Sequence, residues 1–492
     1  MNGFRSGRTL VLFSKSTGCV FVGFGSRDSG SLENWGTGLL RSLNLFLFVF
    51  FVHALTPVST QGDSRWTIPV ALNLIHHGTF DLHENEAEVV RSEFYGVECV
   101  FPDQHRWYPL GSMGECGGPA RLYALYPASI SVLAVPMVVL LEWGLRVASP
   151  LLQPFRERVR SPMIRAFLAG DLEHSTPLVE KVVASVFTAL AAVVIYHTAL
   201  ALLTPSLALA HAFLFAFGTL AFSLVSRALW HHGPSILLNA LAVWLLTRQK
   251  LERKHGIALG AVLATAFFIR PTNAVPAAVI GLLCLLRFRV PVWWLLAGVA
   301  PVVGVCFGMN FAMYGQAISS YFRVNVPGIS GGAIHGLFLH GAYGEALLSN
   351  LVSPARGLFV YMPFLLFLLI PSVWKSPVPE FYGRLRSWFG AIVVLHWLLV
   401  SGYSDWWSGF SYGPRYLSDL LPYMMYLWLP VWGWSAAATG RKAGLGIVMA
   451  AAFFIHFRGA TAIAVHHWNS KPISINQDLR RIWNWSDAPF FR

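Results

Sequence analysis

The sequence predicts an all-α polytopic membrane protein, and three observations support this class. The chain has 492 residues, of which 55% are hydrophobic and only 12% are charged, whereas a soluble domain carries about 25% charged residues. Its apolar runs repeatedly approach or exceed the roughly 17–25 residues that a helix needs to span a bilayer. Runs of this length fit strands poorly, whereas a helix satisfies its own backbone groups inside the membrane.

Eleven apolar runs are expected to form the spanning helices, with ends uncertain by several residues. They cover residues 42–58, 182–203, 206–226, 236–247, 256–270, 274–286, 291–312, 357–373, 388–402, 418–434 and 443–457. A further run, residues 126–145, is also apolar enough to span. Whether it crosses decides the side on which every later loop lies.

The distribution of Lys and Arg favours a topology in which residues 126–145 stay on the outer face. The cytoplasm then receives the N-terminal tail and four short loops with Arg248, Lys250, Arg253, Lys254, Arg287, Arg289, Lys375, Arg384, Arg386, Arg441 and Lys442. Cytoplasmic loops carry an excess of such residues. This topology leaves the basic segment over residues 146–165 on the external face, where the positive-inside rule does not expect it. The net charge of +13 is thereby interpreted as topological bias, and nucleic acid is not expected as a partner.

This topology divides the chain into three regions. Residues 1–38 are expected to be a disordered cytoplasmic tail, residues 39–460 the transmembrane domain, and residues 461–492 an extracytoplasmic tail. The first external loop covers residues 59–181. Cys99 and Cys116 share this loop, and they are a disulfide candidate if the loop is extracytoplasmic.

The first polar motif, Gly62-Asp63-Ser64-Arg65-Trp66, lies at the outer end of the first span. Asp63 is either an ordinary loop acid or a general base that deprotonates an acceptor hydroxyl. Arg65 either contributes to substrate binding or only anchors the loop.

The second motif, "SRALWHHGPS", contains Trp230, His231 and His232 in an external loop. The His pair suits hydrogen bonding to a phosphate or hydroxyl. A divalent metal is not favoured, because no clear carboxylate or third ligand lies nearby in the sequence.

Arginines near the membrane boundary supply further candidates. Arg270 precedes Pro271, which ends or kinks its helix; it either snorkels or binds an anionic group with its guanidinium. Arg356 lies in "NLVSPARGLFVYMP". The densest polar-aromatic stretch is "GYSDWWSGFSYGPRYLSDLLP", which contains Asp405, Trp406, Tyr412, Arg415, Tyr416 and Asp419. Its aromatic residues form either an interfacial belt or a sugar and phosphate pocket.

Together these motifs resemble the GT-C superfamily of polytopic glycosyltransferases, especially family-39-like and protein O-mannosyltransferase-like members. The resemblance covers roughly residues 40–460. It rests on the acid after the first span, on "LYALYPASISVLAVP" in the first loop, on "RPTNAVP", and on "SPARGLFVYMP" with "SDWWSGFSYGPRYLSDLLP". Interfacial helices of the family would explain why residues 126–145 are apolar without crossing.

The resemblance implies an inverting transfer of a sugar from a polyprenyl-phosphate donor to a glycan, lipid or protein acceptor on the extracytoplasmic face. Asp63 matches the loop-one base, and Arg270, Arg356 and Arg415 are candidates for the phosphate. The chain has "LWHHGPS" where metal-dependent relatives carry a tandem acidic pair, so catalysis without a metal or another cofactor is expected. The expected location is a bacterial inner or plasma membrane.

Two other classes of function compete with this hypothesis. A secondary transporter or flippase would place ionisable residues or broken helices near the bilayer midplane, often with an internal repeat. The sequence shows few charges at helix centres, no repeat, and polar motifs on one face, which favours the enzyme. A non-catalytic lipid-binding subunit is the third alternative.

Overall fold

The computed structural model describes residues 32–101, 106–108, 120–248, 250–319, 321, 341–376 and 378–492. Most of the predicted tail, residues 1–38, therefore lies outside the described residues. The described chain is mainly helical, as predicted. Its only sheet within these ranges has three antiparallel strands in the order β2-β1-β3, namely β1 (Val97–Phe101), β2 (Arg106–Tyr108) and β3 (Arg121–Ala124). In this register Cys99 lies opposite Tyr108 and Leu122.

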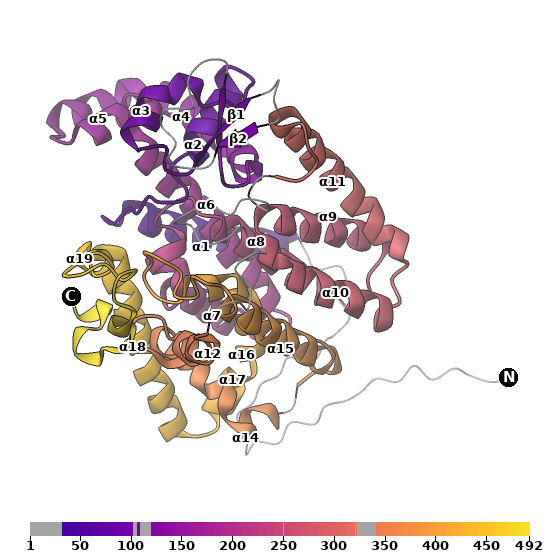
Figure 1. Ribbon diagram of the computed structural model, residues 1–492. Coiled ribbons are helices and arrows are strands. Elements are labelled where there is room, and N and C mark those ends of the chain that lie inside the picture. The colour runs from indigo at the N-terminus through magenta and orange to yellow at the C-terminus, as the bar shows by residue number, and fades with distance from the viewer. Residues whose placement is uncertain are drawn as a thin grey trace.

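The helices are numbered in chain order in Figure 1. Their bounds are α1 (Leu32–Leu55), α2 (Thr67–His76), α3 (Glu86–Arg91), α4 (Ser129–Arg158), α5 (Pro162–Leu168), α6 (Thr176–Ala199), α7 (Pro205–Phe217), α8 (His232–Leu246), α9 (Arg253–Ile269), α10 (Ala274–Leu286), α11 (Val292–Tyr314), α12 (Tyr343–Val352), α13 (Leu358–Tyr361), α14 (Pro371–Trp374), α15 (Glu380–Ser401), α16 (Leu421–Trp428), α17 (Pro430–Ala436), α18 (Thr439–Thr461) and α19 (Ala464–His467).

Five helical segments are long and apolar enough to cross a membrane: Gly38–Leu55, Ser129–Arg158, Glu173–Ala199, Val292–Tyr314 and Thr439–Thr461. The chain is accordingly a helical membrane protein. Four of these segments overlap predicted spans, and the fifth, α4, contains most of the ambiguous run 126–145.

Several predicted spans are shorter or broken in the structure. Residues 357–373 form α13, a 3-10 turn over Pro363–Leu369, and the start of α14. Residues 418–434 form the end of a 3-10 turn, α16 and most of α17. Proline lies at the start of the new elements, because its ring clashes with a preceding helical turn and it lacks an N–H donor. Hydropathy alone does not register these interruptions.

Helices α1 and α6 lie side by side and run antiparallel. Toward one end, Ser42 Oγ lies 3.0 Å from His197 Nε2. At the other end, Lys181 Nζ donates to the Thr56 carbonyl at 2.7 Å. The long connection between the two helices thus leaves and returns at the same end of the pair. Figure 1 shows much of this connection, α2 to α5 with the sheet, gathered at one end of the molecule.

The C-terminal end of α1 is held by a buried arginine from a later segment. Arg227 donates through Nη2 to the His53 carbonyl and to Ser226 Oγ, each at 2.8 Å. Terminal helix carbonyls lack intrahelical donors and carry partial negative charge, so a guanidinium suits this position. The Thr60 amide in turn donates to the Arg227 carbonyl at 3.1 Å. These contacts fix the direction in which the chain leaves α1 toward Asp63.

Helices α9 and α11 pack closely through glycine. A Cβ at Gly298 of α11 would meet the Ile257 carbonyl, and one at Gly260 of α9 would meet the Leu295 backbone. Small residues let membrane helices approach in this way. We expect Gly298→Ala to destabilise the protein by about 1–3 kcal/mol, because backbone cannot move aside as a side chain can.

Gly308→Ala is the matched control on the same helix, since a Cβ there would meet nothing within 4 Å. Thermal unfolding of the detergent-solubilised protein, followed by size-exclusion chromatography, measures both variants. The Gly298 variant should lose its monodisperse peak several degrees below the Gly308 variant. Equal unfolding temperatures would contradict this packing.

Candidate functional site

Asp63 lies in a turn that is hydrogen-bonded to a buried glutamate of α6. The Arg65 amide donates to the Gly62 carbonyl at 3.0 Å and closes the turn. Ser64 Oγ donates to Glu180 Oε2 at 2.6 Å. The Leu229 amide donates to the same oxygen at 3.2 Å, so Glu180 also fixes the segment that leads into Trp230 and the His pair. One carboxylate on α6 therefore positions two of the predicted motifs.

The Asp63 carboxylate has a different partner on each oxygen. Tyr95 Oη donates to Oδ1 at 3.0 Å, and Arg415 Nη1 donates to Oδ2 at 3.1 Å. Trp66 helps to place the tyrosine, because its indole N–H donates to the Tyr95 carbonyl at 2.7 Å. The Asp63 side chain is 27% exposed and that of Arg415 is 11% exposed. Asp63 is thus ion-paired while still reaching the surface.

The surroundings of Asp63 favour its ionised form. Burial raises its pKa, but the Arg415 guanidinium and hydrogen bonds from Tyr95 and Tyr126 outweigh burial, so the pKa lies below the usual value for an aspartate. The effect is reciprocal. Burial lowers the pKa of Arg415, and the Asp63 carboxylate more than compensates, so the pKa of Arg415 is raised. Both partners therefore remain charged at neutral pH.

A second ionic group lies on α8, at the end of α9 and before α16. Arg270 Nε lies 2.7 Å from Asp419 Oδ2, and Arg270 Nη1 lies 2.8 Å from His232 Nε2. Because Arg270 can only donate, His232 Nε2 accepts and its Nδ1 carries the proton. That Nδ1 lies 2.9 Å from Ser418 Oγ and 3.4 Å from Asp419 Oδ2. Pro271 ends α9 here, and Arg270 takes an extended backbone conformation.

Aromatic rings connect the two ionic groups. The Tyr416 ring centroid lies 5.5 Å from Arg270 Cζ and 5.4 Å from Arg415 Cζ. The Trp230 ring lies 4.5 Å from Arg415 Cζ, a distance at which cation–π attraction acts. The Tyr126 and His231 rings are 5.7 Å apart. We define the Asp63 cluster as Asp63, Tyr95, Tyr126, Trp230, His231, His232, Arg270, Arg415, Tyr416 and Asp419.

The Asp63 cluster contains six of the predicted site residues, drawn from four distant motifs: Asp63, His231, His232, Arg270, Arg415 and Tyr416. Tyr95, Tyr126 and Glu180 were not predicted. Tyr126 lies in a quoted motif, and Glu180 lies at the end of the first external loop, two residues before the predicted span 182–203. Nothing in the sequence around Tyr95 distinguishes it from other loop tyrosines.

Arg356 points elsewhere. It is fully buried, and its Nε donates to the Trp407 carbonyl at 2.6 Å. Its Nη2 donates to the Gly409 carbonyl at 3.0 Å and to Asn469 Oδ1 at 2.7 Å. Protein acceptors thus use most of its donors, and in this structure Arg356 supports the loop that leads to Arg415.

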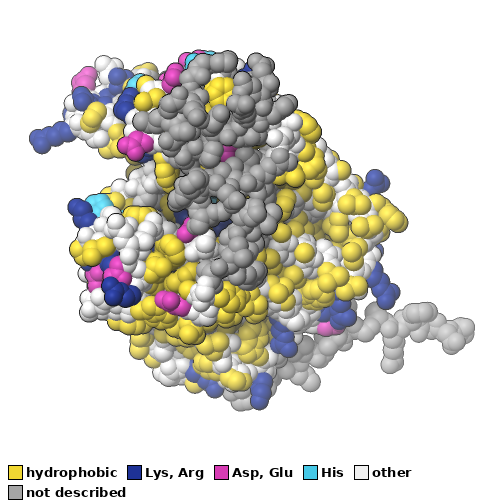
Figure 2. All heavy atoms as spheres, in the orientation of Figure 1, with side chains coloured by type: hydrophobic (Ala, Val, Ile, Leu, Met, Phe, Trp, Pro, Cys, Tyr) yellow, Lys and Arg dark blue, Asp and Glu magenta, His cyan; other side chains and the backbone are white. Residues whose placement is uncertain are grey.

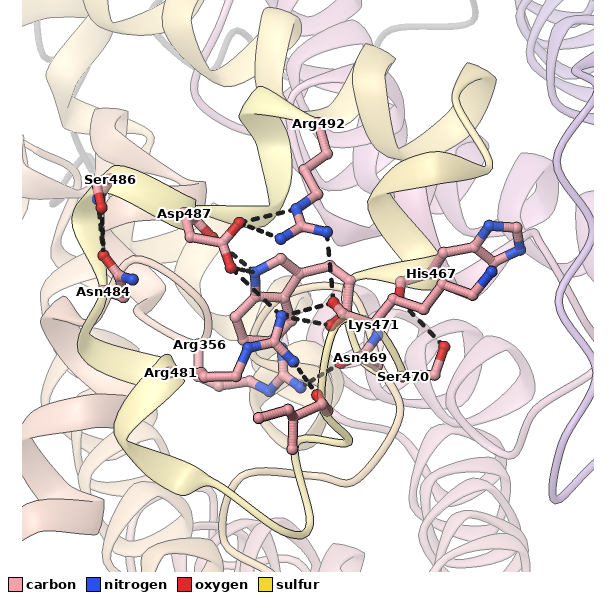
Figure 3. Close-up of polar contacts among 12 residues, drawn as sticks. Arg356, His467, Asn469, Ser470, Lys471, Arg481, Asn484, Ser486, Asp487 and Arg492 are labelled. Atoms are coloured by element: carbon pink, nitrogen blue, oxygen red, sulfur yellow. Dashed lines mark hydrogen bonds and ion pairs between the residues drawn. The ribbon is translucent and has the colours of Figure 1, made fainter.

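The predicted C-terminal tail, residues 461–492, folds against this loop. Figure 3 shows Arg481 and Asp487 at the centre of its polar contacts, with Arg356 and Asn469 beside them. Arg481 Nη2 donates to the carbonyls of Trp468 and Lys471 at 2.9 and 2.8 Å.

The other predicted residues are peripheral to the Asp63 cluster. Trp406 and Tyr412 are buried, and Tyr412 Oη donates to the Ile455 carbonyl at 2.7 Å, so both pack the core. Arg65 belongs to the same turn as Asp63, and its side chain is half-buried. The Asp405 carbonyl accepts from the Ser408 amide at 2.8 Å and helps to close its own loop.

The cysteines agree with an oxidised first loop. Cys99 is disulfide-bonded, and its predicted partner Cys116 lies outside the described residues. Cys284 and Cys306 are free. No group of three or more His, Cys, Asp or Glu side chains within the described ranges is arranged to hold a metal ion. Neither a protein-family model nor a curated protein matches this chain.

Proposed function

We propose that this chain is an integral membrane glycosyltransferase of the GT-C type. It transfers a sugar from a polyprenyl-phosphate donor to a hydroxyl of an extracytoplasmic glycan, lipid or protein. The observation that carries the proposal is the Asp63 carboxylate, ion-paired with Arg415 just beyond the end of α1 and still partly exposed. A general base must meet both a lipid-borne donor and a water-borne acceptor, and a membrane boundary is where they can meet.

The proposed reaction has one proton transfer and one displacement. Asp63 accepts the proton of the acceptor hydroxyl while that oxygen bonds to the anomeric carbon of the sugar. The bond between that carbon and the phosphate oxygen breaks, and its electron pair leaves with the polyprenyl phosphate. Arg415 and Arg270 offset the negative charge that develops on the phosphate. Trp230 and Tyr416 provide ring faces against which a sugar can pack.

The ion pair gives Arg415 a second role in this proposal. In the ion pair, the charge of Arg415 holds the pKa of Asp63 low, which keeps the carboxylate ionised but weakens it as a base. A donor phosphate competes with Asp63 for the guanidinium, because both anions suit its fork of N–H groups. Weakening of the Asp63 pair raises the proton affinity of the carboxylate. Donor binding would thus strengthen the base when its acceptor is required.

The proposed topology keeps eleven spans and an extracytoplasmic Asp63 cluster. The antiparallel pair of α1 and α6 supports it, because a first loop that leaves and returns at one end must cross an even number of times. In the proposed topology α4 therefore does not cross the membrane. Figure 2 shows a broad hydrophobic surface, with Lys and Arg side chains along the lower and right edges and others at the left and upper left. A bacterial inner or plasma membrane is the proposed location.

The pH dependence of transfer tests the role of Asp63. The base must be deprotonated, so kcat/KM falls as the pH drops through the pKa of Asp63. Because that pKa is lowered, the fall should begin below the pH at which a free aspartate titrates, about 3.9. Tyr95→Phe removes one hydrogen bond that lowers the pKa, so its acid limb should move to higher pH.

Tyr343→Phe is the matched control, since its hydroxyl donates to the Leu398 carbonyl at 3.1 Å, away from Asp63. Its acid limb should coincide with that of the wild type. Coincidence of all three profiles would remove Asp63 as the titrating base.

Transport of a lipid-linked sugar is the second candidate, and the broken helices favour it. Interrupted spans such as α13 with α14, and α16 with α17, are common at the binding sites of transporters. Purified protein in liposomes separates the candidates. A transferase produces glycosylated acceptor in detergent, whereas a flippase moves intact donor between leaflets and forms no product.

A further inference from the structure

Helix α4 presents three different faces along its length. Ile130, Ala134, Val138 and Leu145 are buried against the protein. A second face exposes the large apolar side chains of Val139, Leu140, Trp143, Val147, Leu151 and Phe155. At about 100° per residue, this exposed set is centred roughly 130° from the buried one. A helix that is apolar on both its packed and its open face borders lipid.

The third face of α4 is a polar stripe. It runs along one side of the helix, between the buried face and the exposed apolar face. It contains Glu142, Arg146, Gln153 and Glu157, whose spacings of 4, 7 and 4 residues keep them on one line of the helix. Arg146 pairs with Glu142, and Gln153 Nε2 lies 3.5 Å from Glu157 Oε1. A helix that crosses the bilayer would carry this stripe through hydrocarbon, where polar groups are costly. In a helix that lies along the interface, Arg146, Gln153 and Glu157 can face water, while Glu142 is covered by α2.

The contacts of α4 show that the helix lies at the end of the protein that contains Asp63. Ser129 Oγ, at its start, donates to the Phe268 carbonyl at 2.8 Å, two residues before Arg270. In its middle, Glu142 Oε1 lies 3.4 Å from His76 Nε2 of α2. Beyond α5 the chain returns to the same end, where Ser59 Oγ donates to the Pro177 carbonyl at 3.3 Å.

Four arginines gather where α4 ends and α5 begins: Arg156, Arg158, Arg160 and Arg165. Arg158, Arg160 and Arg165 are exposed and Arg156 is half-exposed. None of the four side chains forms an ion pair or hydrogen bond with another residue in the described part of the chain. Met163 and Ile164, between them, are also exposed. Unpaired guanidinium groups next to an exposed apolar face match a membrane surface with anionic head groups.

We infer that α4 and α5, which the proposed topology places along the outer leaflet, bind the phosphate groups of anionic phospholipids through Arg156, Arg158, Arg160 and Arg165. The inference does not depend on sugar transfer, and it accounts for the basic external segment that the positive-inside rule leaves unexplained. Anionic lipid attracts each nearby arginine strongly enough to raise its local concentration about fivefold. These arginines would thus hold the end of the protein that contains Asp63 in the lipid head-group layer.

Depth measurements test the orientation of α4. Nitroxide labels are attached to single cysteines at Val147, Leu151 and Phe155 in liposomes of phosphatidylcholine and phosphatidylglycerol, and power saturation gives their depth. The three labels should have the same shallow depth. A spanning helix would separate the outer two by about 12 Å along the membrane normal, and such a gradient would overturn the inference.

Lipid selectivity tests the arginines. Native mass spectrometry compares retained phosphatidylglycerol with retained phosphatidylcholine. Arg158→Gln should lower this ratio about fivefold, and the fourfold Arg→Gln variant should abolish the preference. Arg146→Gln is the matched control, because that exposed arginine of α4 is already paired with Glu142; its ratio should not change. An unchanged ratio in the fourfold variant, or retention of polyprenyl phosphate alone, would overturn the proposed lipid site.

Discussion

Asp63→Asn is expected to lower the rate of sugar transfer by about 100- to 10,000-fold, the usual contribution of a general base. The substitution keeps the size of the side chain and an oxygen that can accept from Tyr95. It removes the charge that pairs with Arg415 and the ability to take a proton. Because the loss concerns proton transfer, kcat should fall while KM for the lipid-linked donor changes little. Transfer from a radiolabelled polyprenyl-phosphate sugar by protein in nanodiscs measures both constants.

Asp171→Asn is the control for an acid of the same loop. Its carboxylate is exposed and lies 3.0 Å from His174 Nδ1, outside the Asp63 cluster. That variant should transfer sugar at the wild-type rate. If Asp63→Asn also kept full activity, the assignment of the base would be wrong, and a binding or assembly role would gain support.

Arg270→Met is expected to cost about 3–5 kcal/mol of stability, the usual penalty for breaking a buried ion pair. Asp419 is 1% exposed and Arg270 is 13% exposed, so water cannot replace the lost guanidinium. The carboxylate would remain buried with the imidazoles of His232 and His396 as neighbours and without a permanent cation. A lower thermal unfolding temperature in detergent checks this expectation, and transfer should also be lost because a proposed phosphate ligand is missing.

The double variant Arg270→Met with Asp419→Asn separates the two effects. Neutralising Asp419 removes the uncompensated charge, so most of the stability should return. Transfer should remain low, because the guanidinium is still absent. Recovery of both stability and transfer would show that Arg270 has only a structural role.

The helical membrane class was predictable because apolar runs report burial in lipid directly. The ends and continuity of the helices were less so. Residues 357–373 are uniformly apolar, yet Pro363 and Pro371 begin new elements within them. The apolar run was predicted to cover residues 126–145. The helix continues to Arg158, because Glu142, Arg146 and Gln153 fall on one line and leave the other faces apolar.

Most members of the Asp63 cluster were predictable from polar motifs, but Tyr95, Tyr126 and the pairing of the side chains were not. Asp63 and Arg415 are 352 residues apart, and no local spacing links them. Arg356 and Arg415 carried the same signal, each in a motif rich in aromatic residues and glycine. Their side chains have different partners. Arg356 donates to backbone carbonyls, whereas Arg415 pairs with a carboxylate. The direction of a side chain depends on tertiary packing, which composition does not encode.

The most direct test of the central claim is mass spectrometry of lipid-linked sugars and cell-surface glycans in cells that lack this protein. The account predicts that one polyprenyl-phosphate sugar accumulates and that the same sugar disappears from surface glycans. The wild-type chain should reverse both changes, and Asp63→Asn, expressed at the same level, should reverse neither. Unchanged pools of lipid-linked sugar, or full reversal by Asp63→Asn, would contradict the account.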